Sequence, residues 1–301
     1  MIRYIKRLFN TKNDHISEIN DILNNNTDNK LHFELSNTNL IKINISNTTY
    51  DIDYIISEKE FLKILNNLII KEQITLTLVF ILVYHKEISC FIIKNKIENI
   101  HLYGFNFQNL DKLQLNLNNI KHLTLDLSYK SNDELLNILN YVNKMKYLEY
   151  LCCKYIIKQL KEIVNILKYN KTIKHLHLIN NETDFCFREL YVFGEFVRIA
   201  YNILFLNNST LINFTSEDSI INTGVFETLQ YNKTLQNYSS VNETLIIFND
   251  KTINNSINNL KIYNDTLNNI IIDKEKFSND KSQIKLDFHY VNVNFIYLKN
   301  I

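Results

Sequence analysis

A short motif recurs along this chain, and an internal repeat constrains the fold of a sequence more than any local feature does. Each copy begins with an asparagine-containing turn, continues with an aliphatic residue and two variable residues, and ends in an apolar–variable–apolar alternation. The clearest copy is NKTIKHLHLINN at 170–181, and other copies begin at 118, 207, 232 and 254. The alternation is typical of a short strand that sends every second side chain inward.

The spacing of the motif was measured between the central apolar residues of successive predicted strands. Most steps are 22 to 28 residues, and the two longest, 31 and 38 residues, can hold insertions. Leucine-rich repeats have periods of about 20–29 residues. The predicted central residues are Ile43, Ile74, Ile100, Leu123, Leu148, Leu176, Phe214, Tyr238, Leu260 and Ile284.

The segments between the predicted strands carry apolar residues at helical spacing. Ser57 and Ser131 are each followed three residues later by a glutamate, which is the spacing of a capping box. Helices are therefore predicted after both serines. Further helices are predicted at 154–169, around 186–206 and, as one or two turns, at 225–231.

The units within 97–273 resemble divergent leucine-rich repeats of the ribonuclease-inhibitor type. The whole chain resembles the leucine-rich gene families of A/T-rich large DNA viruses. The family usually keeps an asparagine or a cysteine two residues after the last leucine of the strand, and Asn180 matches that position after Leu178. The resemblance implies an α/β solenoid with a curved parallel sheet on its concave side and helices on its convex side. It also implies a cytoplasmic protein that engages a host-cell protein.

The chain is divided by this reading into three parts. Residues 1–95 are predicted to be an N-terminal cap with irregular first repeats, 96–280 the leucine-rich-repeat solenoid, and 281–301 a C-terminal capping strand. The alternative is a separate α/β unit over 1–95, in which the apolar stretch that begins at Ile74 is a central strand. The first residues, MIRYIKRLF, are predicted to form an amphipathic helix that caps the fold or directs the chain to an organelle or a membrane surface.

Composition limits the possible partners. The chain has three glycines and no proline, so asparagine, aspartate and serine must make its turns. Its formal charge is +1, which disfavours a nucleic-acid partner. The longest apolar stretch, 74–84, is shorter than the roughly 20 residues of a membrane span, so no membrane span is expected. Asn-x-Ser/Thr triplets, such as those at Asn170, Asn208 and Asn232, are expected to arise by chance in a chain so rich in asparagine.

No motif for catalysis, a cofactor or a metal is evident. The chain has no glycine-rich phosphate loop, and its four cysteines are expected to be reduced, mostly buried thiols. Two weaker alternatives stay open. One is a nucleophile and base made by Cys152 or Cys153, which are expected to follow a strand, with His175. The other is a metal held by His175 and His177.

The residues between the inward-facing aliphatic positions are predicted to form a concave binding face. The function predicted from this face is that of a non-enzymatic protein–protein interaction module with no cofactor and no small-molecule substrate. The alternatives are a substrate-recognition adaptor of a ubiquitin-ligase-type complex and an enzyme with a cysteine- or metal-dependent site. The predicted face consists of His101, Tyr103, His122, Thr124, Tyr147, Glu149, His175 and His177.

Overall fold

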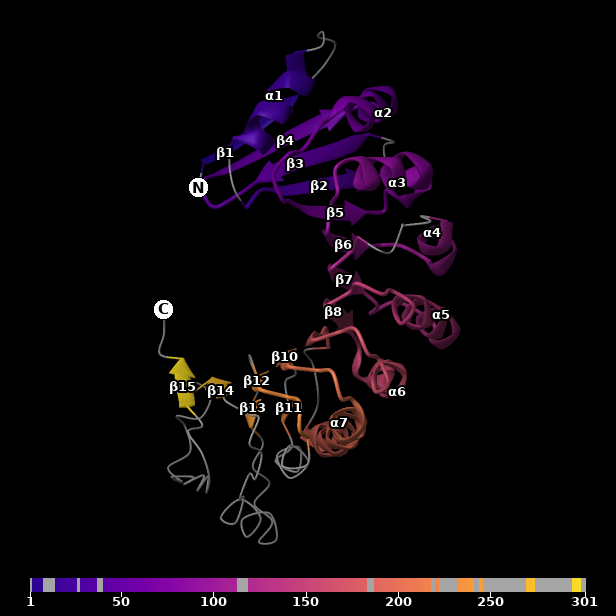
Figure 1. The fold of residues 1–301 in the computed structure, drawn as a ribbon, viewed down its shortest axis with the longest axis vertical. Coiled ribbons are helices and arrows are strands. Elements are labelled where there is room, and N and C mark those ends of the chain that lie inside the picture. Colours follow the sequence, from indigo (N-terminus) through magenta and orange to yellow (C-terminus); the bar gives the residue numbers. More distant parts are fainter. Residues whose placement is uncertain are drawn as a thin grey trace, which may run out of the picture. The chain divides into compact units, whose positions relative to one another are not determined.

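The chain folds into an α/β structure with mostly parallel strands (Figure 1). It comprises two compact units, Met1–Asp126 with Met145–Leu148, and Leu127–Lys144 with Glu149–Ile301. This computed structural model describes residues 2–7, 14–25, 28–36, 40–112, 119–182, 187–217, 220–221, 232–240, 244–245, 269–273 and 294–298.

The first unit alternates strands and helices after an irregular start. Its strands lie in the order β1-β4-β3-β2-β5-β6-β7. Strands β2, β3 and β4 pair antiparallel, whereas the pairs β1–β4, β2–β5, β5–β6 and β6–β7 are parallel. The strands are β1 (Ile2–Arg7), β2 (Lys30–Leu35), β3 (Ile41–Ser46), β4 (Tyr50–Ile56), β5 (Thr75–Val79), β6 (Asn99–Tyr103) and β7 (His122–Asp126), and the helices are α1 (Asp14–Asn24), α2 (Glu58–Asn67), η1 (Leu82–Tyr84), α3 (His85–Lys94) and α4 (Phe107–Lys112).

Aromatic side chains fill the space between the sheet of the first unit and its helices. Phe33 of β2 is fully buried and lies edge-on to Phe61 of α2, with ring centroids 5.1 Å apart. The ring centroid of Phe33 also lies 5.8 Å from that of Phe91 in α3. Because neighbouring residues of a strand point to opposite faces, His32 and Glu34 lie on the other face of the sheet. One face of this sheet is therefore packed on helices.

The second unit has strands that follow the order of the chain. The order is β8-β9-β10-β12-β14-β15, and every neighbouring pair is parallel. A separate parallel pair is formed by β11 and β13. The elements are α5 (Asn132–Val142), β8 (Tyr150–Tyr155), η2 (Ile157–Gln159), α6 (Leu160–Leu167), β9 (His175–Asn180), α7 (Phe187–Asn207), β10 (Asn213–Glu217), β11 (Ile220–Ile221), β12 (Asn237–Ser240), β13 (Thr244–Leu245), β14 (Asn269–Asp273) and β15 (Asn294–Leu298).

A buried asparagine makes each of three turns that lead into a strand of the second unit. The side-chain oxygen of Asn170 accepts hydrogen bonds from the backbone amides of Thr172 and Ile173, at 2.9 and 2.7 Å. Asn208 and Asn232 bind the residues two and three positions further on in the same way. The Asn-x-Thr triplets at these three positions thus form recurring turns.

Several sequence predictions are confirmed. Ser57 and Glu60 form the complete capping box of α2, and the side chain of Ser131 accepts from the amide of Glu134 at the start of α5. The strands contain the predicted central residues Ile100 (β6), Leu123 (β7), Leu176 (β9) and Phe214 (β10). The helix expected at 186–206 is α7. The helix expected at 154–169 is shorter, because β8 extends to Tyr155.

Other predictions are wrong in register or in type. The N-terminal residues 2–7 form strand β1 and not a helix. Ile43 lies on an antiparallel strand, so it does not belong to the parallel series. The residue of β5 that pairs with Ile100 is Leu76, two residues after Ile74. The residue of β8 that pairs with Leu176 is Leu151, three residues after Leu148.

The C-terminal predictions fall partly outside the described residues. Leu260, Ile284 and the short helix at 225–231 lie there. The strand that pairs with β12 is β14, which places Ile270 beside Tyr238, and β15 lies within the part predicted to be a capping strand. The predicted boundary between 95 and 96 lies inside the first unit, where β5 and β6 pair across it.

Candidate functional site

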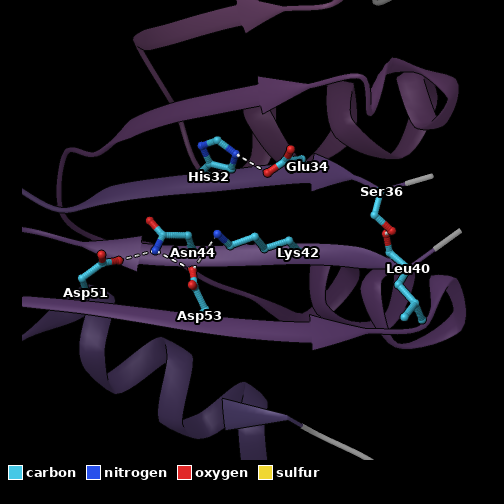
Figure 2. Close-up of polar contacts among 8 residues, drawn as sticks. All are labelled: His32, Glu34, Ser36, Leu40, Lys42, Asn44, Asp51 and Asp53. Carbon is cyan, nitrogen blue, oxygen red and sulfur yellow. Dashed lines mark hydrogen bonds and ion pairs between the residues drawn. The ribbon is translucent and has the colours of Figure 1, made fainter. Parts of the chain in front are cut away.

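The face of the first unit's sheet that lies opposite its aromatic core is polar. We call it the open face of the first unit and define it by the residues of β2 to β7 that alternate along each strand with the apolar residues of the core. Figure 2 shows part of it, with the side chains of β2, β3 and β4 next to one another. In register, His32 pairs with Asn44 and Asn44 with Asp53, so these three form one row across the strands.

An internal network holds the polar side chains of β3 and β4 in place. The Asp53 side chain is buried and lies 3.2 Å from the Lys42 ammonium nitrogen. The amide nitrogen of Asn44 donates to the carboxylates of both Asp53, at 2.8 Å, and Asp51 (Figure 2). Burying a carboxylate is unfavourable unless it is paired and hydrogen-bonded, and both conditions are met for Asp53.

A hollow of about 550 Å³ lies over this network. It is open to solvent, and all of its lining residues are of polar or charged types. The lining consists of Asp28, Lys30, His32, Glu34, Lys42, Asn44, Ser46, Asn47, Thr48 and Asp51.

The surroundings of the hollow shift the pKa of His32. Burial lowers the pKa of its imidazole, and the nearby Glu34 carboxylate opposes that shift. Its Nε2 atom lies 3.5 Å from a Glu34 carboxylate oxygen (Figure 2). Lys42 adds to the lowering and Asp53 opposes it. His32 is therefore neutral at pH 7.

Acidification is expected to destabilise the chain through His32. A histidine whose folded pKa lies below its unfolded value, near 6.5, binds protons more readily in the unfolded chain, so stability falls as the pH drops below about 6.5. We expect the urea midpoint of the wild type to fall more between pH 7.5 and 5.5 than that of His32→Gln. Parallel midpoints for the two proteins would contradict the neutral state of His32 in the fold.

The predicted residues on β6 and β7 lie on the same open face. His101 of β6 pairs in register with Thr77 of β5 and with Thr124 of β7, and Asn99 pairs with His122. His122 is exposed and Thr124 is buried by its neighbours. Tyr103 ends β6 and is half-buried. The structure thus gathers His101, Tyr103, His122 and Thr124 on neighbouring strands.

In the second unit, His177 lies at the centre of a hydrogen-bonded group on the equivalent face, which we call the open face of the second unit. Its Nε2 atom is 2.8 Å from a Glu217 carboxylate oxygen, and its Nδ1 atom is 3.2 Å from the Tyr150 hydroxyl. A carboxylate can only accept, so Nε2 carries the proton and the Tyr150 hydroxyl donates to Nδ1. The side-chain nitrogen of Asn213 likewise donates to Nδ1 of His175.

Tyr147 and Glu149 were predicted to lie on a strand, and this is wrong, because β8 begins at Tyr150. Tyr147 is exposed in a bend. The backbone oxygen of Glu149 accepts from the amides of Lys174 and His175, and its carboxylate lies 2.8 Å from the Lys174 ammonium. Glu149 is thus at the rim of the open face of the second unit.

Cys152 and Cys153 lie within β8. The repeat motif had predicted that they follow the strand. Both are buried, with Cys152 in register with His177 and Cys153 in register with Leu178. Burial raises the pKa of the Cys153 thiol well above its usual value, with a further contribution from Cys152. Burial also raises the pKa of Tyr150, to about 12. A thiol and a phenol in these states are protonated at neutral pH and are poor nucleophiles.

Within the described ranges, no three or more His, Cys, Asp or Glu side chains lie close enough together to hold an ion. His175 is instead hydrogen-bonded to Asn213, and His177 to Glu217.

Sequence reasoning missed the hollow and the group around His177. The hollow is built by antiparallel strands, and the repeat motif gives no information about them. The Tyr150 hydroxyl was missed because the register of β8 was shifted. The alternation of polar and apolar residues in 30–35 and 41–46 was a signal that could have indicated the polar face.

Comparison with known proteins adds no assignment. No model of a known protein family matches this chain, and no curated protein matches its sequence. Across the part of the chain that the structure describes, no helix is both long and apolar enough to span a membrane.

Proposed function

We propose that this chain is a non-enzymatic protein-binding module built as a leucine-rich-repeat-type solenoid, and that the open faces of its sheet contact the partner. The proposal of a solenoid is supported by strands that pair parallel in chain order, β5-β6-β7 in the first unit and β8-β9-β10-β12 in the second, with a helix between most of them. Solenoids commonly use the sheet face for binding.

The observation that carries the proposal is the way the polar side chains of the open faces are held. His177 is fixed between Tyr150 and Glu217, and Asn44 is fixed between two carboxylates. A side chain already held in one conformation loses little entropy when a partner binds, which favours affinity. Tyrosine, histidine and asparagine at such positions can donate and accept hydrogen bonds to a protein surface.

An enzymatic alternative gains less support from the same residues. A general base needs a pKa near the working pH, and Tyr150 has a pKa of about 12. Both nitrogens of His177 are already hydrogen-bonded, so the imidazole is not placed to take a proton from Cys152. These groups are better suited to a rigid surface than to proton transfer.

The proposal is tested by substitutions in the first unit. The wild-type chain is immobilised, the protein that it retains from its native cell is purified, and the affinity is measured by calorimetry. We expect His101→Thr with His122→Thr to weaken binding by at least about tenfold. The melting temperature should change little, because substitutions at such surface positions usually alter stability by less than about 0.5 kcal/mol.

The matched control replaces two exposed residues of α2, Lys59→Ser with Asn66→Ser, and should bind as the wild type does. Equal affinity of the open-face variant and the wild type would refute a role for this face. Failure of the wild type to retain any protein in that setting would refute the binding function itself.

A further inference from the structure

Four turns of the second unit are stacked through their asparagine side chains. The turns precede β8, β9, β10 and β12, which pair parallel in that order. The side-chain nitrogen of Asn170 donates to the side chain of Asn143, that of Asn208 to the backbone oxygen of Asn170, and that of Asn232 to the backbone oxygen of Asn208. Neighbouring strands lie about 4.8 Å apart, so the turns before them form a closely spaced row.

An exposed lysine directly follows three of these four asparagines. These lysines are Lys144, Lys171 and Lys233, and Ser209 takes the corresponding place in the remaining turn. Over 143–144, 149, 168–174, 207–212 and 232–236, the chain carries five lysines and one acidic residue, Glu149. We call these lysines the lysine edge of the second unit, which consists of Lys144, Lys168, Lys171, Lys174 and Lys233.

The charges of this edge act together. Lys171 and Lys233 belong to turns that are two strands apart, or about 10 Å, and Lys144 belongs to the turn on the other side of Lys171. The Debye length at about 0.1 M salt is also about 10 Å, so neighbouring turns contribute to one positive potential. A helix dipole favours lysines within the last turn of a helix, but Lys171 stands four residues beyond the end of α6.

Large side chains with apolar surface are exposed beside these lysines. Tyr169, next to Lys168 in the chain, is 65% exposed, and Leu206, two residues before the turn asparagine Asn208, is 57% exposed. Tyrosine is enriched where membranes meet water, and lysine side chains extend toward lipid headgroups. A phosphate polymer would satisfy the lysines alone, whereas a bilayer surface also takes up an aliphatic side chain such as Leu206.

We propose that the lysine edge of the second unit binds the surface of an anionic membrane. The ammonium groups contact lipid phosphates and carboxylates, and Tyr169 and Leu206 lie at the level of the headgroups. The chain lies on the bilayer and does not cross it. This binding goes beyond the proposed function and does not depend on it, because the lysine edge precedes the strands and shares no residue with the open faces.

The test is cosedimentation of the wild-type chain with phosphatidylcholine vesicles that contain about one third phosphatidylserine, at about 0.1 M salt. We expect Lys171→Ser with Lys233→Ser to weaken binding by at least about tenfold, because each lysine near such a surface strengthens binding roughly fivefold. Lys171→Arg with Lys233→Arg keeps both charges and should bind as the wild type does. Tyr169→Ser should weaken binding less than the serine pair does.

The matched control is Lys158→Ser with Lys161→Ser, which removes two exposed lysines near the start of α6, at its opposite end. It should bind as the wild type does, and both serine pairs should keep the wild-type melting temperature. Equal loss of binding in the two serine pairs would overturn the proposal. So would equal binding of the wild type to vesicles with and without phosphatidylserine.

Two measurements on the wild type keep the test decisive if a variant does not fold. Binding to the anionic vesicles should be lost at about 1 M salt, where the Debye length falls to about 3 Å, and undiminished binding there would overturn the proposal. Tighter binding to a single-stranded oligonucleotide than to the vesicles would assign the lysine edge to nucleic acid and overturn the lipid.

Discussion

Replacing Asn208 with alanine is expected to lower the free energy of unfolding by about 2–4 kcal/mol. The Asn208 side chain is buried, and its oxygen accepts from the amides of Thr210 and Leu211, at 2.9 and 2.8 Å. Its nitrogen donates to the backbone oxygen of Leu167, at 2.9 Å. Alanine leaves the amides of Thr210 and Leu211 without this acceptor, in a place that water reaches poorly, whereas the Leu167 oxygen keeps its hydrogen bond from the Asn170 amide. Each unmade bond costs about 1–3 kcal/mol before relaxation.

The preceding residue offers a matched control. Asn207 is exposed at the end of α7 and donates only to Ile203, in the same helix, at 2.7 Å. We expect Asn207→Ala to change the stability by less than about 0.5 kcal/mol. Urea titrations followed by circular dichroism compare the two variants. Equal midpoints for Asn207→Ala and Asn208→Ala would contradict the structural role of the turn.

The repeat of such turns explains why much of the second unit could be predicted. Asn170, Asn208 and Asn232 each stand five residues before a strand, at His175, Asn213 and Asn237. The side-chain nitrogen of each asparagine donates to a residue of the preceding repeat. Each turn therefore also fixes the distance between neighbouring strands. A chain with three glycines has few other ways to build such turns, and the motif was visible for that reason.

The register of β8 could not be read from the pattern. Leu148 and Leu151 are both aliphatic, three residues apart and fully buried. Leu148 lies before β8, and Leu151 lies within it. Elsewhere an asparagine turn distinguishes these two positions, but Met145 stands where Asn170 stands in the next repeat. Without the turn residue the two leucines are equivalent in the sequence, and Tyr147 was placed on a strand by this error.

The antiparallel part of the first unit lay beyond the repeat. Strand β3 returns between β2 and β4, and the polar residues on its open face come together only through that pairing. Asn44 meets Asp53 across nine residues of sequence, whereas His32 meets Thr77 across forty-five. Strand order at this distance depends on which edges pair, and hydrophobic alternation alone does not encode it.

Phe214 connects helix α7 of the second unit to the sheet. The side chain is buried, and its ring is 5.0 Å from those of both Tyr201 and Phe205 in α7, edge-on in each case. Phe214→Ala is expected to lower the free energy of unfolding by about 3–5 kcal/mol, since it removes a large buried side chain and leaves a cavity. The loss of two edge-on ring contacts adds to that cost.

A leucine at the same position separates the volume of the side chain from its aromatic contacts. Phe214→Leu keeps most of the buried apolar surface and should cost less than about 2 kcal/mol. Hydrogen exchange measured by mass spectrometry should show faster exchange in α7 and β10 of the alanine variant, because both elements lose their shared contact. If Phe214→Ala and Phe214→Leu unfolded at the same urea concentration, the packing of α7 on β10 would have to be different. The inward direction of Phe214 follows from its pairing with Leu176, so that result would also remove the basis for placing His175 and His177 on the opposite, open face.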